Sequence, residues 1–163
     1  MPSSPEPRPW LLATTVLGLA HAAVSLWWAL GGTWLLGTVG GQIEEWGRAG
    51  SPGLRLLLLV VVAVKVTAVA LTWLAVLRGG RIERILAWTA GAVLTAYGGM
   101  FTFVGVLVVS DVVSAPAEAD LYALKWHALF WDPWFLLWGL CTLAAMWLSR
   151  SGRPQRGGVS HGE

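Results

Sequence analysis

Four long apolar runs divide this chain of 163 residues, and they constrain its fold more than any other feature. The runs cover residues 10–36, 54–77, 85–109 and 126–148. Each is long enough to cross a hydrocarbon core of about 30 Å as an α-helix with a rise of about 1.5 Å per residue. Helices are required because backbone polar groups must be paired inside a bilayer and no strand-like alternation is present. The sequence therefore predicts an all-α integral membrane bundle of four transmembrane helices.

Charge and cysteine content narrow the classes of function. Only 12% of the residues are charged and the formal net charge is +2, whereas a soluble domain has roughly 25% charged residues. No basic stripe with interleaved aromatic residues is present, so we expect no nucleic-acid binding. Cys141 is the single cysteine, which excludes an intrachain disulfide and a cysteine metal cluster. Catalytic and nucleotide-binding motifs are absent, and we expect neither a metal nor a cofactor.

The cations are distributed unequally between the two sides of the predicted bundle. Seven arginines lie in residues 1–9, 78–84 and 149–163. The opposite side has three cations, namely Arg48, Arg55 and Lys125. Because cytoplasmic loops carry the excess of cations, we expect both termini in the cytoplasm. Residues 1–9 are then a cytoplasmic N-terminus, and residues 10–148 are the transmembrane domain. Residues 149–163 are rich in Gly, Ser and Arg, and we expect them to form a disordered cytoplasmic tail.

The first run has a second interpretation. Arg8, the apolar stretch after it and the step Ala20, His21, Ala22 imitate a signal peptide with its cleavage site. The apolar run continues to Leu36, however, where a signal peptide would have ended. An uncleaved first span is therefore the favoured interpretation.

Lys65 is an ionisable residue inside a predicted span, where charges are costly and are associated with function. It lies about 16 Å along the second helix, and Asp132 lies about 9 Å along the fourth. An extended lysine side chain spans the difference, so Asp132 is the expected partner, and pairing would offset part of the cost of burying both charges. Two alternatives stay open: Lys65 snorkels to the outer surface, or it acts on a ligand, a proton or a substrate.

The fourth run contains the sequence WHALFWDPWFLLWG at residues 126–139. Asp132 followed by Pro133 makes a good N-cap and first helical residue. A helix that begins there would leave residues 133–148, about 24 Å, which is short for a span. We therefore expect the fourth helix to be kinked or broken at Asp132-Pro133, with residues 116–131 able to form an amphipathic helix at the outer surface.

Aromatic residues recur at helical spacing in this run. His127, Trp131, Trp134 and Trp138 would share one face of an unbroken helix. A stripe of indoles favours a groove for a flat lipophilic or cationic ligand. The alternative is an aromatic belt at the membrane interface combined with ordinary packing.

Two other spans carry polar or small residues at a similar depth. His21 in the first span and Tyr97 in the third lie near the level of Lys65, and the third span has a face of small residues that permits close helix packing, formed by Gly91, Thr95, Gly98, Thr102 and Gly105. The sequence does not establish whether the polar groups converge. The candidate outer-facing pocket comprises His21, Lys65, Tyr97, His127, Trp131, Asp132, Trp134 and Trp138.

The two ends of the predicted bundle are similar to a known family. The strings HAAVSLWWALGGTW and KWHALFWDPWFLLWG resemble those of small bacterial membrane proteins grouped as domain of unknown function 3995, and WALGGTW and WDPWFLLWG are the most specific parts. The resemblance extends over most of residues 10–148. It implies four spans and a location in the bacterial plasma membrane, and it implies no particular activity.

Three functions follow as hypotheses. The first is a non-enzymatic membrane protein that binds a small lipophilic or lipid-like ligand, or a membrane protein partner, through the candidate pocket. The second is a membrane-embedded enzyme that uses Lys65, His21, His127 and Asp132 for acid–base chemistry on a lipid-soluble substrate. The third is a small proton-coupled transporter. The expected surroundings are the lipid bilayer, and a homo-oligomer is left open.

Overall fold

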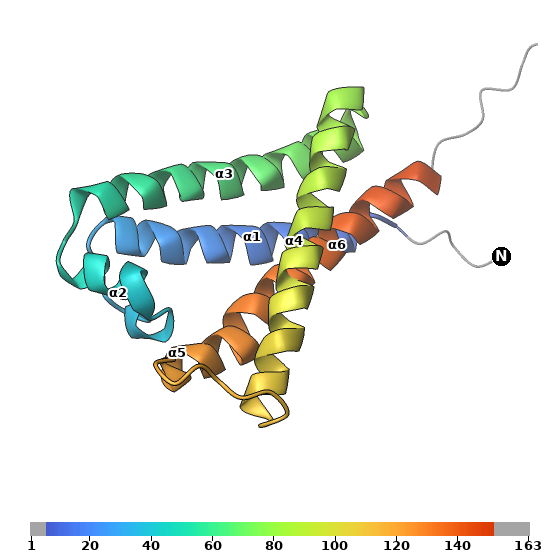
Figure 1. The fold of residues 1–163 in the computed structure, drawn as a ribbon. Coiled ribbons are helices and arrows are strands. Elements are labelled where there is room, and N and C mark those ends of the chain that lie inside the picture. The colour runs from blue at the N-terminus through green and yellow to red at the C-terminus, as the bar shows by residue number, and fades with distance from the viewer. Residues whose placement is uncertain (1–5, 152–163) are drawn as a thin grey trace, which may run out of the picture.

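A computed structural model describes residues 6–151, and in this part of the chain every regular element is a helix (Figure 1). The predicted terminal segments, residues 1–9 and 149–163, therefore lie largely outside the described residues. The elements in chain order are α1 (Arg8–Ala29), the 3₁₀ turn η1 (Leu36–Thr38), α2 (Gly41–Arg48), α3 (Pro52–Leu77), α4 (Arg81–Val109), α5 (Leu121–Trp126), the π-helical turn η2 (His127–Trp131) and α6 (Asp132–Ser151).

Four stretches are long and apolar enough to cross a membrane. They are α1, α3, α4 and the stretch Leu121–Arg150, which α5, η2 and α6 form together. These stretches agree with the predicted runs in number and order, although the first ends at residue 29 and not at residue 36, and the fourth begins at residue 121 and not at residue 126. The chain is a multi-pass membrane protein built from an all-α bundle.

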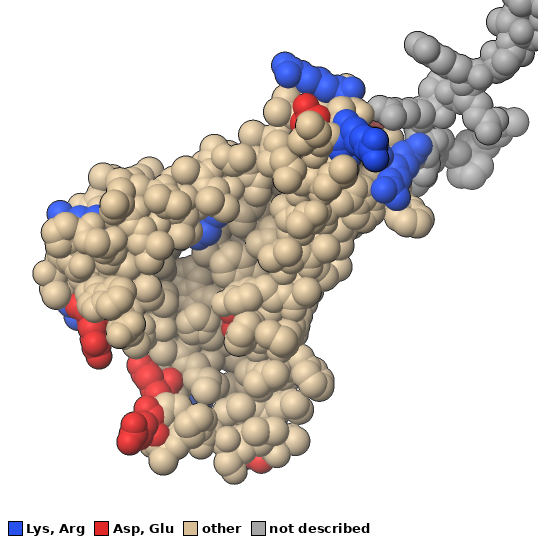
Figure 2. All heavy atoms as spheres, turned by 45° about the horizontal axis from the view of Figure 1, so that its top comes forward, with Lys and Arg blue, Asp and Glu red and all other residues tan. Residues whose placement is uncertain are grey.

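The four spans form two antiparallel pairs. Helix α1 packs along α3, and α4 packs along α6, while α1 also contacts α6. The pairs meet near the turn between α3 and α4 and diverge toward the end that carries α2 and α5 (Figure 1). Most Lys and Arg side chains in view gather near the turn between α3 and α4, and most Asp and Glu side chains gather at the end with α2 and α5 (Figure 2). We call the end with α2 and α5 the α2–α5 end.

Small residues bring the backbones of α4 and α6 into contact. A Cβ atom on Gly98 would lie 2.7 Å from the carbonyl oxygen of Asp132, and one on Gly139 would lie 2.9 Å from that of Gly91. Contacts of this length are closer than a side chain tolerates, so only glycine fits. The predicted small-residue face of the third span is thus the surface on which α6 packs.

The helix disturbance predicted at Asp132-Pro133 takes the form of the π-helical turn η2, which directly precedes it. Proline lacks a backbone N–H, and its ring crowds the carbonyl four residues earlier, so a wider turn before it relieves the conflict. Asp132 itself has helical φ and ψ of −74° and −41°, and the predicted N-cap at Asp132 is wrong. The cap is Asp120, whose Oδ1 accepts hydrogen bonds from the backbone of Tyr122 and Ala123.

Candidate functional site

The loop between α1 and α3 is held against η2 at the α2–α5 end. The indole of Trp131 donates to Thr38 Oγ1 at 3.0 Å, and His127 Nε2 lies 3.3 Å from the carbonyl oxygen of Val39. Trp28 donates across the loop to the carbonyl oxygen of Trp34 at 2.7 Å. Trp131 is only 3% exposed, so this indole fastens the loop to the bundle and presents little surface to a ligand.

Lys65 is bound to α1 and not to Asp132. Its ammonium donates to Ser25 Oγ at 2.7 Å and lies 2.9 Å from His21 Nδ1. Among residues 6–151, no carboxylate lies within 4.0 Å of this ammonium. The predicted ion pair with Asp132 is therefore wrong, because the ammonium is bound to Ser25 and His21 on the neighbouring helix α1.

His21 sits in an aromatic enclosure. Its ring centroid lies 4.4 Å from that of Phe135, 5.2 Å from that of Trp134 and 5.6 Å from that of Trp131. The residue is 5% exposed, and its Nε2 has no hydrogen-bond partner among the described residues. When Nδ1 accepts a hydrogen bond from the ammonium of Lys65, Nε2 carries the imidazole hydrogen. His21 thus keeps one buried donor unused.

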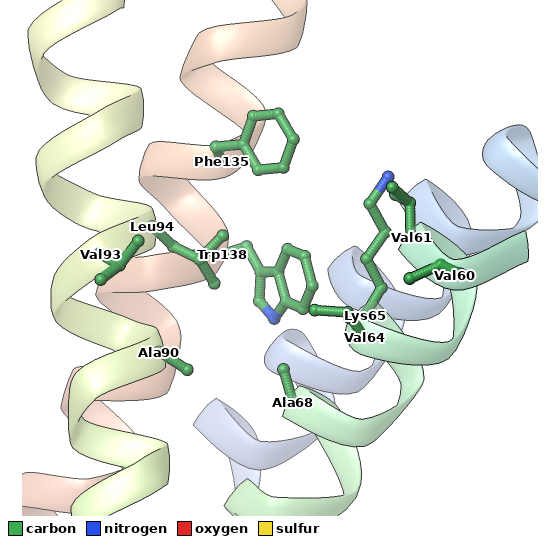
Figure 3. A pocket seen from close by; sticks show the side chains of 10 residues that line it. All are labelled: Val60, Val61, Val64, Lys65, Ala68, Ala90, Val93, Leu94, Phe135 and Trp138. Atoms are coloured by element: carbon green, nitrogen blue, oxygen red, sulfur yellow. The ribbon is translucent and has the colours of Figure 1, made fainter. Parts of the chain in front are cut away.

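A cavity of 320 Å³ lies between α3 on one side and α4 and α6 on the other (Figure 3). We call it the Lys65 cavity. Its facing surface is entirely apolar, since Lys65 contributes its methylene stem while its ammonium turns to α1. That ammonium lies 5.9 Å from the ring centroid of Phe135, which lines the cavity together with Trp138.

A second cavity of 370 Å³ lies between α4 and the α5–η2 segment. We call it the Asp132 cavity. Tyr97, Phe101, His127 and Asp132 line it together with apolar residues. His127 Nδ1 lies 3.5 Å from Asp132 Oδ1, and Asp132 is 4% exposed. Five of the eight candidate residues thus line one of the two cavities, whereas His21, Trp131 and Trp134 line neither.

An aromatic contact joins the two cavities. The ring of Tyr97 in the Asp132 cavity meets the ring of Phe135 in the Lys65 cavity edge to face, with centroids 5.5 Å apart. Trp134 lies against His21, and its indole donates to the carbonyl oxygen of Leu17 at 3.1 Å. The candidate set therefore does converge in space, but Lys65 with His21 and Asp132 with His127 form separate polar groups.

Two residues of the site were not in the predicted set. Ser25 follows His21 by one helical turn on α1 and supplies an acceptor to Lys65. Phe135 lies four residues after Trp131 and three before Trp138, so helical spacing alone places it on their face. The sequence pattern could have identified both, because each lies three or four residues, about one helical turn, from a residue already in the predicted set.

Comparison with known proteins adds a family and no activity. A model for a protein of unknown function, DUF3995, matches residues 18–142. No curated protein and no solved structure matches. The matched range reaches into all four spans and includes both cavities. Because it covers more than half of the chain, the protein belongs to the DUF3995 family of proteins of unknown function.

Proposed function

We propose that this membrane protein binds an amphiphilic, lipid-like molecule in the Lys65 cavity. The hydrocarbon chain lies against α3, α4 and α6, and an anionic or hydrogen-bond-accepting head group lies at Lys65. One observation carries the proposal: an apolar cavity between three of the long apolar helices is bordered by a lysine for which residues 6–151 provide no carboxylate partner.

The walls of the cavity suit a hydrocarbon chain. Its rim includes Val60, Val64 and Val93, which are 53%, 63% and 60% exposed on the outer surface of their helices. In a membrane these side chains face lipid, so the cavity opens sideways into the bilayer. Figure 2 shows this face hollowed between the α1–α3 pair and α4. A volume of 320 Å³ is at the lower end of the range for ligand pockets, about 300–1,000 Å³, and suits a single chain.

The ammonium of Lys65 supplies the recognition of the head group. A lysine has three donors, and His21 and Ser25 take two of them. Both partners are neutral acceptors when His21 is neutral, so they satisfy hydrogen bonds without compensating the charge. A lysine at the centre of a membrane helix costs roughly 2.5–3.5 kcal/mol on insertion scales. Since the ammonium turns to α1 and is not part of the cavity surface, the Lys65 side chain has to turn toward the cavity to meet a ligand. An anionic head group would then offset part of this cost and accept a hydrogen bond from the ammonium.

The test compares two probes with the same chain, oleate and oleyl alcohol, on purified protein in maltoside micelles. We expect native mass spectrometry and calorimetry to show tighter binding of oleate. Lys65→Met should remove the preference for oleate, because the head group loses its cation. The thermal stability of this variant is measured alongside, since Lys65 also links α1 to α3.

A matched pair of variants keeps the test independent of Lys65. Ala90 of α4 lines the cavity, whereas Ala92 is exposed and does not. Ala90→Phe should fill the cavity and weaken the binding of both probes, while Ala92→Phe should leave binding unchanged. Equal binding by these two variants would contradict the proposal.

A further inference from the structure

We propose that the Asp132 cavity is a second binding site, which accepts a lipophilic ammonium ion. The site is distinct from the Lys65 cavity, has the opposite charge and does not depend on the function proposed above. It combines a buried carboxylate, two aromatic rings and an apolar wall, and each of these features favours the same class of ligand.

The carboxylate of Asp132 is poorly satisfied by the protein. Its single partner among the described residues is His127 Nδ1, at 3.5 Å from Oδ1, whereas charge-assisted hydrogen bonds are about 2.7–2.9 Å long. Oδ2 has no donor within residues 6–151 and is not among the fully enclosed polar atoms of that range. This oxygen therefore remains open to a donor that enters from the cavity.

The hydrogen bonding of His127 makes the charge of its ring decide whether the histidine donates a hydrogen bond to Asp132. A backbone carbonyl only accepts, so the contact with Val39 places a proton on Nε2. Nδ1 of the neutral imidazole then presents a lone pair to Asp132, and it becomes a donor only when the ring carries a second proton. With a neutral His127, Asp132 has no donor from the described chain, and a ligand N–H⁺ group supplies the missing one.

The rest of the cavity matches the body of such a ligand. Tyr97 and Phe101 lie with their ring centroids 4.6 Å apart and both line the cavity, and the faces of aromatic rings attract cations. Val104, Val108, Leu124 and Ala128 provide apolar wall. Acidic side chains also gather at the α2–α5 end, near this cavity (Figure 2), and they raise the local concentration of cations.

Phenylbutylamine, which is protonated at neutral pH, and phenylbutanol, its neutral counterpart, are suitable probes in uncharged maltoside micelles. We expect calorimetry to show that the protein binds the amine about tenfold more tightly than the alcohol, as a hydrogen bond to a charged group implies. Asp132→Asn should reduce this ratio to near one. A ratio that stays unchanged in folded Asp132→Asn protein would overturn the proposal.

A second pair of variants covers the case in which Asp132→Asn does not fold. Val108 lines the cavity, whereas Val106 on the same helix is exposed and does not. Val108→Phe should abolish binding of the amine, and Val106→Phe should retain it. Ala90→Phe, which fills the Lys65 cavity, should also retain it. Loss of amine binding in Ala90→Phe, or its retention in Val108→Phe, would place the amine elsewhere and refute the site.

Discussion

Replacing Gly98 by alanine tests the close approach of α4 and α6, because the adjacent Gly99 provides a control on the same helix. A Cβ atom on Gly98 would lie 2.7 Å from the carbonyl oxygen of Asp132 and 2.8 Å from Cα of Leu136, both backbone atoms. A Cβ atom on Gly99 would meet only Leu136 Cδ1, at an ordinary 3.6 Å. The two helices must therefore separate to accept alanine at Gly98, and they need not move for alanine at Gly99.

The difference between the two variants isolates the cost of this separation. Both gain the same helix propensity, about 0.8–1.0 kcal/mol in water, so this contribution cancels. Overpacking costs typically about 1–3 kcal/mol, and contacts with rigid backbone atoms place Gly98 toward the upper end. We expect Gly98→Ala to be less stable than Gly99→Ala by about 2–3 kcal/mol.

Unfolding by dodecyl sulfate in mixed maltoside micelles, followed by circular dichroism, gives the two free energies of unfolding. The wild-type protein and Gly99→Ala should unfold at similar detergent fractions, and Gly98→Ala should unfold earlier. A difference below about 0.5 kcal/mol, the usual effect of a surface substitution, would show that α4 and α6 do not approach each other this closely.

Two further predictions use the same preparation or intact cells. In a double-mutant cycle of unfolding, Lys65→Met and Ser25→Ala should show a coupling energy of about 0.6–1.7 kcal/mol, as hydrogen bonds in membranes do. The effects of Lys65→Met and Asp132→Asn should instead be additive within about 0.5 kcal/mol. Coupling to Asp132 without coupling to Ser25 would restore the predicted ion pair between Lys65 and Asp132. For orientation, Glu45→Cys and Arg81→Cys are made separately in a background without the native cysteine. An impermeant maleimide on intact cells should label the cysteine at Glu45 and not the one at Arg81, and the opposite pattern would invert the predicted topology.

The sequence specified the spans and one packing surface, but not the partner of Lys65. Apolar runs of sufficient length and the glycines of the third span are local signals, and the structure confirms both. The pairing with Asp132 was inferred from depth alone. Depth fixes the position of a residue along a helix, whereas the contact with Ser25 depends on the rotation of α3 against α1, which arises from packing of whole helices.

The π-helical turn explains a second limit of prediction from sequence. A regular repeat of about 3.6 residues per turn places His127 on the same stripe as Trp131 and Trp138. The turn His127–Trp131 is wider than an α-helix, so it rotates residues before it relative to those after it. As a result His127 lines the Asp132 cavity while Trp138 lines the Lys65 cavity, so residues that share one stripe in the sequence line two different cavities.

Under the proposed function, a ligand reaches the Lys65 cavity from the bilayer, and this changes how much free energy its binding can gain. A ligand that enters from the bilayer leaves hydrocarbon and not water, so burial of its chain brings no hydrophobic gain, as for contacts between transmembrane helices. Lipid chains are also present at high concentration as competitors for the same space. Selection among them must then come from the fit of the chain and from the head group at Lys65, and affinities are best expressed as mole fractions in the membrane rather than as concentrations in water.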